Sequence, residues 1–237
     1  MELDEYSNDS TITNLSIYPD DSPFLFDTKE FEYTPSIEEL KPKINNVVSS
    51  AYLGCNLNLK NIAFKIKNAE FNTSKASTLI LKSNDNNTSA TIFSNGKMVC
   101  TGAKNEKESK SSCKRFANMI KKVGFNIELK EFKIQNIVAS YDIQFQISLI
   151  CLYNKINSLI NNNDSNFGKD KNNYCKFNKD ILPGIVFYLN ESKISFLIFE
   201  SGKVVVSGAK KRKEIEYIFK KIYPVLIECK KSENEEK

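Results

Sequence analysis

The chain contains no histidine and no tryptophan. Without histidine it lacks the commonest general base of enzymes and every Ser-His or Cys-His nucleophile pair. Its six cysteines form no C-x-x-C pair, so the usual zinc-ligand sets are absent as well. Each of its three Gly-Lys pairs is followed by Met, Val or Asp, where a phosphate-binding P-loop requires Ser or Thr. These absences disfavour both an enzyme and a metal site.

The chain also lacks a recognisable targeting segment. Its N-terminus is acidic where a signal peptide is basic, and no apolar run approaches the length needed to span a bilayer. We therefore expect a protein that stays inside the cell.

Charge is distributed unevenly along the 237 residues. Residues 1–40 hold eleven acidic residues and one lysine, so residues 41–237 carry a net +15 within a chain whose net charge is +5. A basic body indicates a polyanionic partner, such as nucleic acid or a membrane surface, while an ordinary solvated surface is the alternative. Residues 1–41 are expected to be a disordered acidic arm, and residues 232–237 a disordered tail.

Between these ends the sequence repeats itself. Residues 92–104 return as residues 198–210 with eight of thirteen positions identical, and residues 45–50 return as 135–140 in the same order. We predict a first repeat over 42–131 and a second over 132–231, and a ligand that is itself nearly two-fold symmetric. The second copy is 16 residues longer, which we assign to an Asn-rich insertion over about 154–178, expected to be a disordered loop.

Each repeat is predicted to run strand, helix, three strands, helix. In the first repeat the strands are expected over 44–52, 77–82, 89–93 and 97–101, and the short helix near 59–66. The long helices have the apolar stripes Cys113, Phe116, Ala117, Ile120 and Val123 and Ile215, Ile218, Phe219 and Ile222. Gly124 is placed to cap the first long helix, and Pro224 is expected to end or kink the second. Single-striped helices predict an α+β fold, with a curved antiparallel sheet in each repeat covered by helices on one face.

The hairpins around Gly96 and Gly202 decide which side chains occupy the uncovered face. A two-residue loop sets Phe93 opposite Met98, whereas a three-residue loop with Gly in third place sets it opposite Lys97. The second copy has no Asn-Gly but again has Gly third, which favours the three-residue loop. One face then carries Thr91, Phe93, Lys97, Val99 and Thr101, and its counterpart Leu197, Phe199, Lys203, Val205 and Ser207.

An apolar sheet face bordered by lysines is typical of a binding surface, although the same residues also suit a core beneath a third layer. A broad apolar sheet with a few Asn and Thr side chains favours a DNA minor groove opened by deformation. Asn46 and Asn136 are expected to supply donors near the pseudo-dyad, and Lys97 and Lys203 to reach phosphates.

Several motifs, in one order, resemble those of the TATA-box-binding protein (TBP) family over about residues 42–231. They are Leu53-Gly-Cys55, Asn68-Ala-Glu70, Gly96-Lys-Met-Val-Cys-Thr-Gly-Ala-Lys104, Gln135-Asn-Ile-Val138, Pro183-Gly184, Ser201-Gly-Lys203 and Ser207-Gly-Ala-Lys210. The resemblance implies a pseudo-two-fold saddle, no cofactor, no enzymatic activity and a place in the nucleus. It also implies a general transcription factor that bends TATA-like promoter DNA by inserting phenylalanines and nucleates the pre-initiation complex.

Carried over by position, the family's base contacts fall on Asn46, Val48, Thr91, Phe93, Val99, Thr101, Asn136, Val138, Leu182, Leu197, Phe199, Val205 and Ser207. Phosphate contacts are expected at Lys75, Lys82, Lys97, Lys104, Lys203 and Lys210. Of the family's two wedge pairs only Phe93 and Phe199 are kept, and the partner positions hold Ala76 and Leu182. Because Ala lacks the reach to enter a base step, we expect a shallower kink beside Ala76. Thr91 and Tyr188 stand where the family usually has Leu and Arg, which implies altered affinity or sequence preference.

The resemblance further implies protein partners. Transcription factor IIB is expected near Asp180 and Leu182, transcription factor IIA near Glu70, and TBP-associated factors elsewhere. The Asn-rich insertion either modulates the IIB contact or is a neutral expansion. Two other functions stay open: a regulatory paralogue that has lost productive bending, and an enzyme, for example in nucleobase repair, although the uncovered face has no paired carboxylate or activated nucleophile.

Overall fold

The structure is a computed structural model that describes residues 33–67, 69–72, 77–83, 87–162, 172–179 and 182–231. The body of the protein begins at Tyr33. Outside the described residues lie Lys75, Ala76 and Asp180, most of the predicted acidic arm, and the predicted tail.

The described residues form ten strands and four helices, which divide into two halves of the same order. The first half contains β1 Lys43–Tyr52, α1 Leu59–Lys65, β2 Ala69–Asn72, β3 Thr78–Lys82, β4 Ser89–Phe93, β5 Lys97–Ala103 and α2 Glu106–Lys122. The second contains β6 Lys130–Asp142, α3 Leu149–Asn161, β7 Tyr174–Phe177, β8 Gly184–Leu189, β9 Ile194–Phe199, β10 Lys203–Ala209 and α4 Arg212–Glu228. The predicted boundary at 131/132 therefore falls just inside β6.

All ten strands belong to one antiparallel sheet. Its order is β2-β3-β4-β5-β1-β6-β10-β9-β8-β7, so β1 and β6 join the two halves and the short strands β2 and β7 form the edges. The first strand of each repeat thus pairs with its own counterpart, with Val47 opposite Ile137. This pairing places equivalent residues of the two repeats symmetrically about the centre of the sheet.

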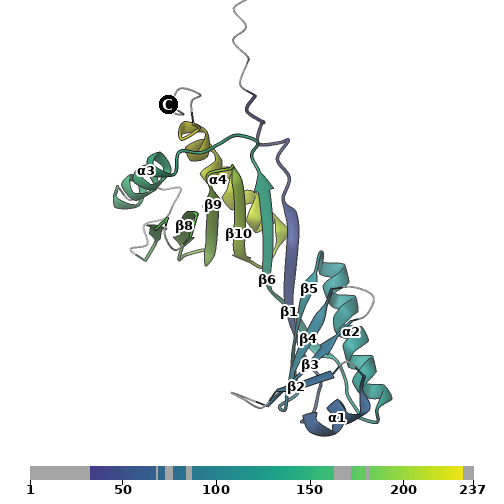
Figure 1. Cartoon of the computed structure of the whole chain (residues 1–237). Helices are drawn as coiled ribbons and strands as arrows, with labels where there is room; N and C mark the ends of the chain where they lie inside the picture. The colour runs from purple at the N-terminus through teal and green to yellow at the C-terminus, as the bar shows by residue number, and fades with distance from the viewer. Residues whose placement is uncertain are drawn as a thin grey trace, which may run out of the picture. The chain divides into compact units, whose positions relative to one another are not determined.

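The helices of each repeat pack on one face of the sheet (Figure 1). The predicted stripe of α2 is buried at Cys113, Phe116, Ala117 and Ile120, where it packs with α1 and the inward side chains of β3–β5. The predicted stripe of α4 is buried in the same way against β6 and β8–β10. Gly124, with a φ of +100°, directly follows the C-cap residue Val123 of α2, as predicted. The helix α4, however, continues through Pro224 to Glu228, so of the two effects expected of this proline, ending or kinking the helix, the first is wrong.

The predicted disordered insertion is wrong where the structure describes it. Residues 154–161 belong to α3, whose Leu152 and Ile156 are buried in the core, and residues 174–177 form the edge strand β7. The ring of Tyr153 on α3 lies 6.1 Å from that of Phe177 on β7. A few apolar residues at helical and strand spacing are enough to anchor both elements, despite the surrounding asparagines. The edge strand β2 was missed because it has only four residues, and β7, equally short, because it also lies in the asparagine-rich segment.

The segment 33–41 was predicted to belong to the disordered arm, but it packs against the second repeat. The hydroxyl of Tyr223 on α4 donates a hydrogen bond to the carbonyl oxygen of Pro35. Ile37 and Leu40 pack on the same hydrophobic cluster as α4. The ordered body therefore starts before Pro42. The apolar side chains of this segment pack on the cluster of α4, which is distant in sequence, so the composition of the segment itself does not predict this order.

Within the described residues, no helix is long and apolar enough to cross a membrane. The same part of the chain holds no group of three or more acidic, His or Cys side chains placed to bind a metal ion. All six cysteines are free.

Candidate nucleic-acid interface

Two equivalent hairpins set the register of the sheet face opposite the helices. In the first repeat Ile92 pairs with Met98, which leaves Phe93 opposite Lys97 across a three-residue loop. Gly96, third in that loop, has a φ of +83° and donates its N–H to the carbonyl oxygen of Phe93 at 3.0 Å. Gly202 has the same φ and donates to Phe199 at the same distance. The predicted register is confirmed in both repeats.

Side chains alternate between the two faces along these strands up to Gly102 of β5 and Gly208 of β10. Met98 and Cys100 of β5 are buried beneath the helices, whereas Val99 and Thr101 are half-buried on the other side. The half-buried set, here called the open face, consists of Asn46, Val48, Thr91, Phe93, Val99 and Thr101 and their counterparts Asn136, Val138, Leu197, Phe199, Val205 and Ser207. Neither phenylalanine belongs to a core cluster. Among the described residues no helix or third layer covers this face, so it is a surface and not a core.

Two asparagines lie at the centre of the open face, each tied to a glycine of the neighbouring strand. The Oδ1 of Asn46 accepts a hydrogen bond from the N–H of Gly102 at 2.7 Å, and Asn136 accepts from Gly208 at 2.7 Å. Both glycines have positive φ, and the pairing of each strand shifts register at this point, as in a β-bulge. Because the Oδ1 of each asparagine accepts a hydrogen bond from the backbone N–H, the NH₂ group of the same amide points away from that glycine. The bulges thus orient both amide groups. The Nδ2 of Asn136 also donates to the hydroxyl of Ser207 at 3.2 Å, which leaves one of its two N–H groups for a ligand.

The two phenylalanines have small cross-strand neighbours. Phe199 at the end of β9 pairs with Gly184, and Phe93 at the end of β4 pairs with Thr78. A Cβ on Gly184 would lie 2.7 Å from the carbonyl oxygen of Ile198, so only glycine fits there. Leu182, half-buried, precedes β8 in a tight turn in which its carbonyl oxygen accepts from the N–H of Gly184 at 2.8 Å. The predicted wedge position Leu182 therefore lies two residues from the partner of Phe199.

The cations predicted to contact phosphates differ in their surroundings. Lys97 and Lys203 are exposed at the first positions of β5 and β10. The Nζ of Lys104 donates to the carbonyl oxygen of Asn45 at 2.8 Å, which holds its charge beside β1. Lys82, predicted to contact a phosphate, forms an ion pair with Glu70, which was predicted to contact transcription factor IIA. The exposed pair is screened by water and adds little to stability.

Sequence reasoning missed the outer edge of the second repeat. Tyr174 and Lys176 of β7 are exposed on one side of that strand, whereas Cys175 and Phe177 pack on the core. Burial raises the pKa of the Cys175 thiol to about 12. The period-two pattern of these four residues was the available signal, but the surrounding asparagines obscured it.

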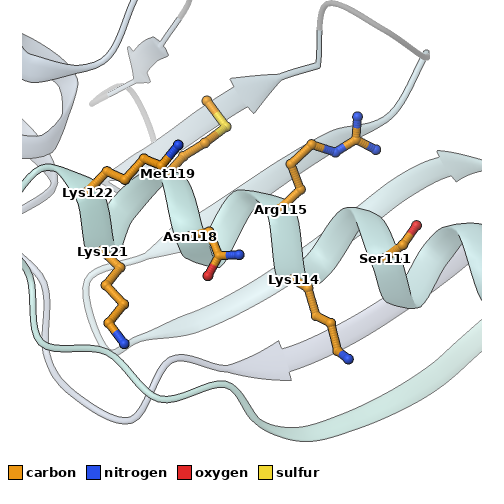
Figure 2. Close-up of a pocket in the computed structure, with 7 residues that line it drawn as sticks. All are labelled: Ser111, Lys114, Arg115, Asn118, Met119, Lys121 and Lys122. Carbon is orange, nitrogen blue, oxygen red and sulfur yellow. The ribbon is translucent and has the colours of Figure 1, made fainter.

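A second basic region lies on the outer surface of α2. Figure 2 shows Lys114, Arg115, Lys121 and Lys122 on this helix together with Ser111, Asn118 and Met119. These residues line a groove of about 610 Å³. Arg115 also donates to the hydroxyl of Ser83 at 3.1 Å. Because α2 packs on the other face of the sheet, this groove is separate from the open face.

Comparison with known proteins identifies the family. The sequence profile described as "Transcription factor TFIID (or TATA-binding protein, TBP)" matches residues 41–123 and 131–229, one segment for each repeat. The chain belongs to the TBP family. It is 41% identical over 191 residues to the TATA-box-binding protein of Acanthamoeba castellanii, covering 81% of this chain and 68% of that protein. It is 40% identical over 190 residues to that of Acetabularia peniculus, covering 80% of this chain and 92% of that protein.

A solved TBP has the same fold. The chain superposes on the structure of Methanococcus jannaschii TBP with a TM-score of 0.64 and 29% identity, covering 79% of this chain and 99% of that one. The predicted α+β fold of two repeats is therefore confirmed. The TBP family consists of DNA-binding transcription factors without enzymatic activity, so the enzyme alternative is excluded.

Proposed function

We propose that the chain is a nuclear general transcription factor that binds TATA-like, A/T-rich promoter DNA through the minor groove, bends it by inserting phenylalanine and nucleates the pre-initiation complex. The observation that carries this proposal is the open face itself. It is a half-buried apolar surface with Phe93 and Phe199 at equivalent hairpins and no covering layer in the described residues.

The chemistry of the open face suits the minor groove of A·T pairs. There both A·T and T·A present only acceptors, adenine N3 and thymine O2. The amide groups of Asn46 and Asn136 supply donors at the centre of the face, where the pseudo-dyad of the protein would coincide with that of the groove. Val48, Val138 and the other apolar members would replace water along the groove floor.

Bending would come from the two phenylalanines. Apolar wedges that enter a base step unstack it and kink the duplex away from the minor groove. Phe199 has Leu182 nearby as a second wedge, whereas the position equivalent in the first repeat is Ala76. We propose unequal kinks, with the shallower one beside Ala76 dependent on Phe93 and on an easily unstacked pyrimidine–purine step.

Lysines around the face would hold the phosphates. Lys97, Lys203 and Lys210 are exposed, and their contacts would release counterions, so binding should weaken steeply with salt. Lys75, Lys82 and Lys104 belong to the same proposed set, although Lys82 must first leave Glu70. Replacing Lys97 by Ala should lower affinity for all sequences alike, because a phosphate contact carries no base information.

Protein partners would bind at the two ends of the sheet. Transcription factor IIB is proposed to contact the loop containing Asp180 and Leu182, transcription factor IIA the region of Glu70, and TBP-associated factors other surfaces of the same body. Pull-down of each factor with the body bound to DNA tests these assignments one at a time.

The test of the main proposal is an unbiased selection of duplexes from a random library, read out together with DNA bending. Enrichment of A/T-rich sites that are bent on binding supports it, and recovery of unrelated sequences contradicts it. The alternative of a regulatory paralogue with weakened bending is favoured by Ala76 and Leu182 at wedge positions. It predicts the same selected sites with little bending.

A further inference from the structure

The outer edges of the two repeats carry different charges. Thr78 opposite Phe93 and Gly184 opposite Phe199 align the repeats, so Lys82 and Tyr188 occupy equivalent positions four residues further on. On the edge strands, Glu70 lies opposite Ile80, and Lys176 lies opposite Val186. The equivalent of the Lys82–Glu70 ion pair is therefore Tyr188 with Lys176. The first edge is neutral as a pair, and the second carries one positive charge.

The second edge is an ordered aromatic platform. Tyr174 pairs directly with Tyr188 across β7 and β8, and their rings stack with centroids 5.2 Å apart and planes at 27°. The Nζ of Lys176 lies 4.8 Å from the centroid of Tyr174, within the range of a cation–π contact. Asn173, itself buried, accepts a hydrogen bond from the N–H of Asn190 at 2.8 Å and fixes the start of β7. The Tyr174 ring thus favours a position of the Lys176 ammonium group on this platform.

This platform continues the open face. Cys175 and Phe177 pack on the core, so alternation places Tyr174 and Lys176 on the opposite side of β7. On β8 the same side carries Val186 and Tyr188, which pair with Leu197 and Ser195 of β9. Leu197 is a member of the open face, so the platform extends that face outward from β9 by two strands, β8 and the edge strand β7. Lys176 forms no ion pair with any described residue, and its charge is available to a ligand on this side.

We infer that Lys176, supported by the Tyr174–Tyr188 stack, contacts a backbone phosphate of DNA bound on the open face. This inference rests on the proposed function. The second repeat has a tyrosine where the first has Lys82, and the cation has moved to the next strand outward. A phosphodiester fits because the platform is continuous with a face proposed to bind a duplex, and because lysine binds phosphate as a point charge without bidentate geometry. The contact has no equivalent in the first repeat, where Glu70 occupies that position.

The test compares Lys176→Gln with wild type in titrations of an A/T-rich duplex over a range of salt concentrations. Losing one phosphate contact should reduce the slope of log K against log salt by about 0.9. Lys176→Arg should restore the slope, and Tyr174→Phe should preserve it because the ring stays. The matched control is Lys213→Gln, which makes the same charge change at an exposed position of α4 on the other side of the sheet. It should leave the slope unchanged.

A scan of the same duplex with single methylphosphonates, which lack the phosphate charge, identifies the contacted group. One neutral phosphate near one end of the site should remove the difference between wild type and Lys176→Gln, as expected for a coupled pair. If wild type binds A/T-rich DNA and Lys176→Gln has the wild-type slope, or no methylphosphonate couples to it, the inference is wrong and the proposed function stands. If wild type fails to prefer A/T-rich DNA, both are wrong.

Discussion

Replacing Asn46 by Asp separates the two functions of its side-chain amide. The Oδ1 accepts from the N–H of Gly102 at 2.7 Å, and a carboxylate oxygen preserves this bond. The NH₂ group, proposed to donate to a base, becomes an acceptor that faces adenine N3 or thymine O2. An unpaired acceptor costs about 1–3 kcal/mol. The affinity for an A/T-rich duplex should therefore fall about 5- to 150-fold.

The matched variant Asn46→Ala removes both groups. It leaves the N–H of Gly102 without its acceptor, so the free energy of unfolding should fall by about 1–3 kcal/mol, while Asn46→Asp should stay near wild type. Fluorescence anisotropy with A/T-rich and G·C-rich duplexes measures binding, and urea titration measures stability. Since guanine N2 offers a donor in the minor groove, Asn46→Asp should also reduce the preference of the protein for A·T over G·C pairs. Wild-type affinity of a folded Asn46→Asp protein would refute the assigned donor.

Three further results are expected. Gly202→Ala should lower the free energy of unfolding by several kcal/mol, because its Cβ would lie 2.2 Å from a backbone oxygen. Gly124→Ala, whose Cβ would have nothing within 4 Å, should cost only about 1–2 kcal/mol for its positive φ. Equal losses in urea titrations would show that the steric contact at Gly202 does not affect stability. The kink beside Ala76 should be the shallower of the two, and Ala76→Phe should make the two kinks more alike. The fluorescence of 2-aminopurine placed at each end of the DNA site measures the unstacking there. Equal signals at the two ends with wild type would contradict this. Iodoacetamide at pH 8 should alkylate the exposed Cys151 in the native protein and leave Cys175 intact. The reason is that burial raises the pKa of the Cys175 thiol to about 12, which keeps it protonated. Early modification of Cys175, detected by mass spectrometry, would contradict its burial.

The parts of the sheet and helices that were predicted correctly depend on local rules. The third position of such a hairpin loop requires a positive φ, which glycine adopts most readily, and the place of glycine therefore fixed the register of Phe93 and Phe199. Strand alternation then assigned whole rows of side chains to one face. The stripes of α2 and α4 followed from helical periodicity alone.

The missed parts depend on contacts between distant residues. The helix α3 and the strand β7 lie in asparagine-rich sequence, and they are stabilised by burial of Leu152 and Ile156 and by the Tyr153–Phe177 contact. The segment before Pro42 is likewise ordered by Tyr223. The hydrogen bonds from the bulge N–H groups of Gly102 and Gly208 to the side-chain oxygens of Asn46 and Asn136 also require two strands in register, which composition does not specify.

The central claim, that the open face bends A/T-rich DNA, is tested most directly by energy transfer between dyes at the two ends of a short A/T-rich duplex. Wild type should bring the ends closer at saturating protein, and the double variant Phe93→Ala/Phe199→Ala should bind without doing so. Tight binding by wild type with unchanged energy transfer, or equal bending by the double variant, would contradict the claim.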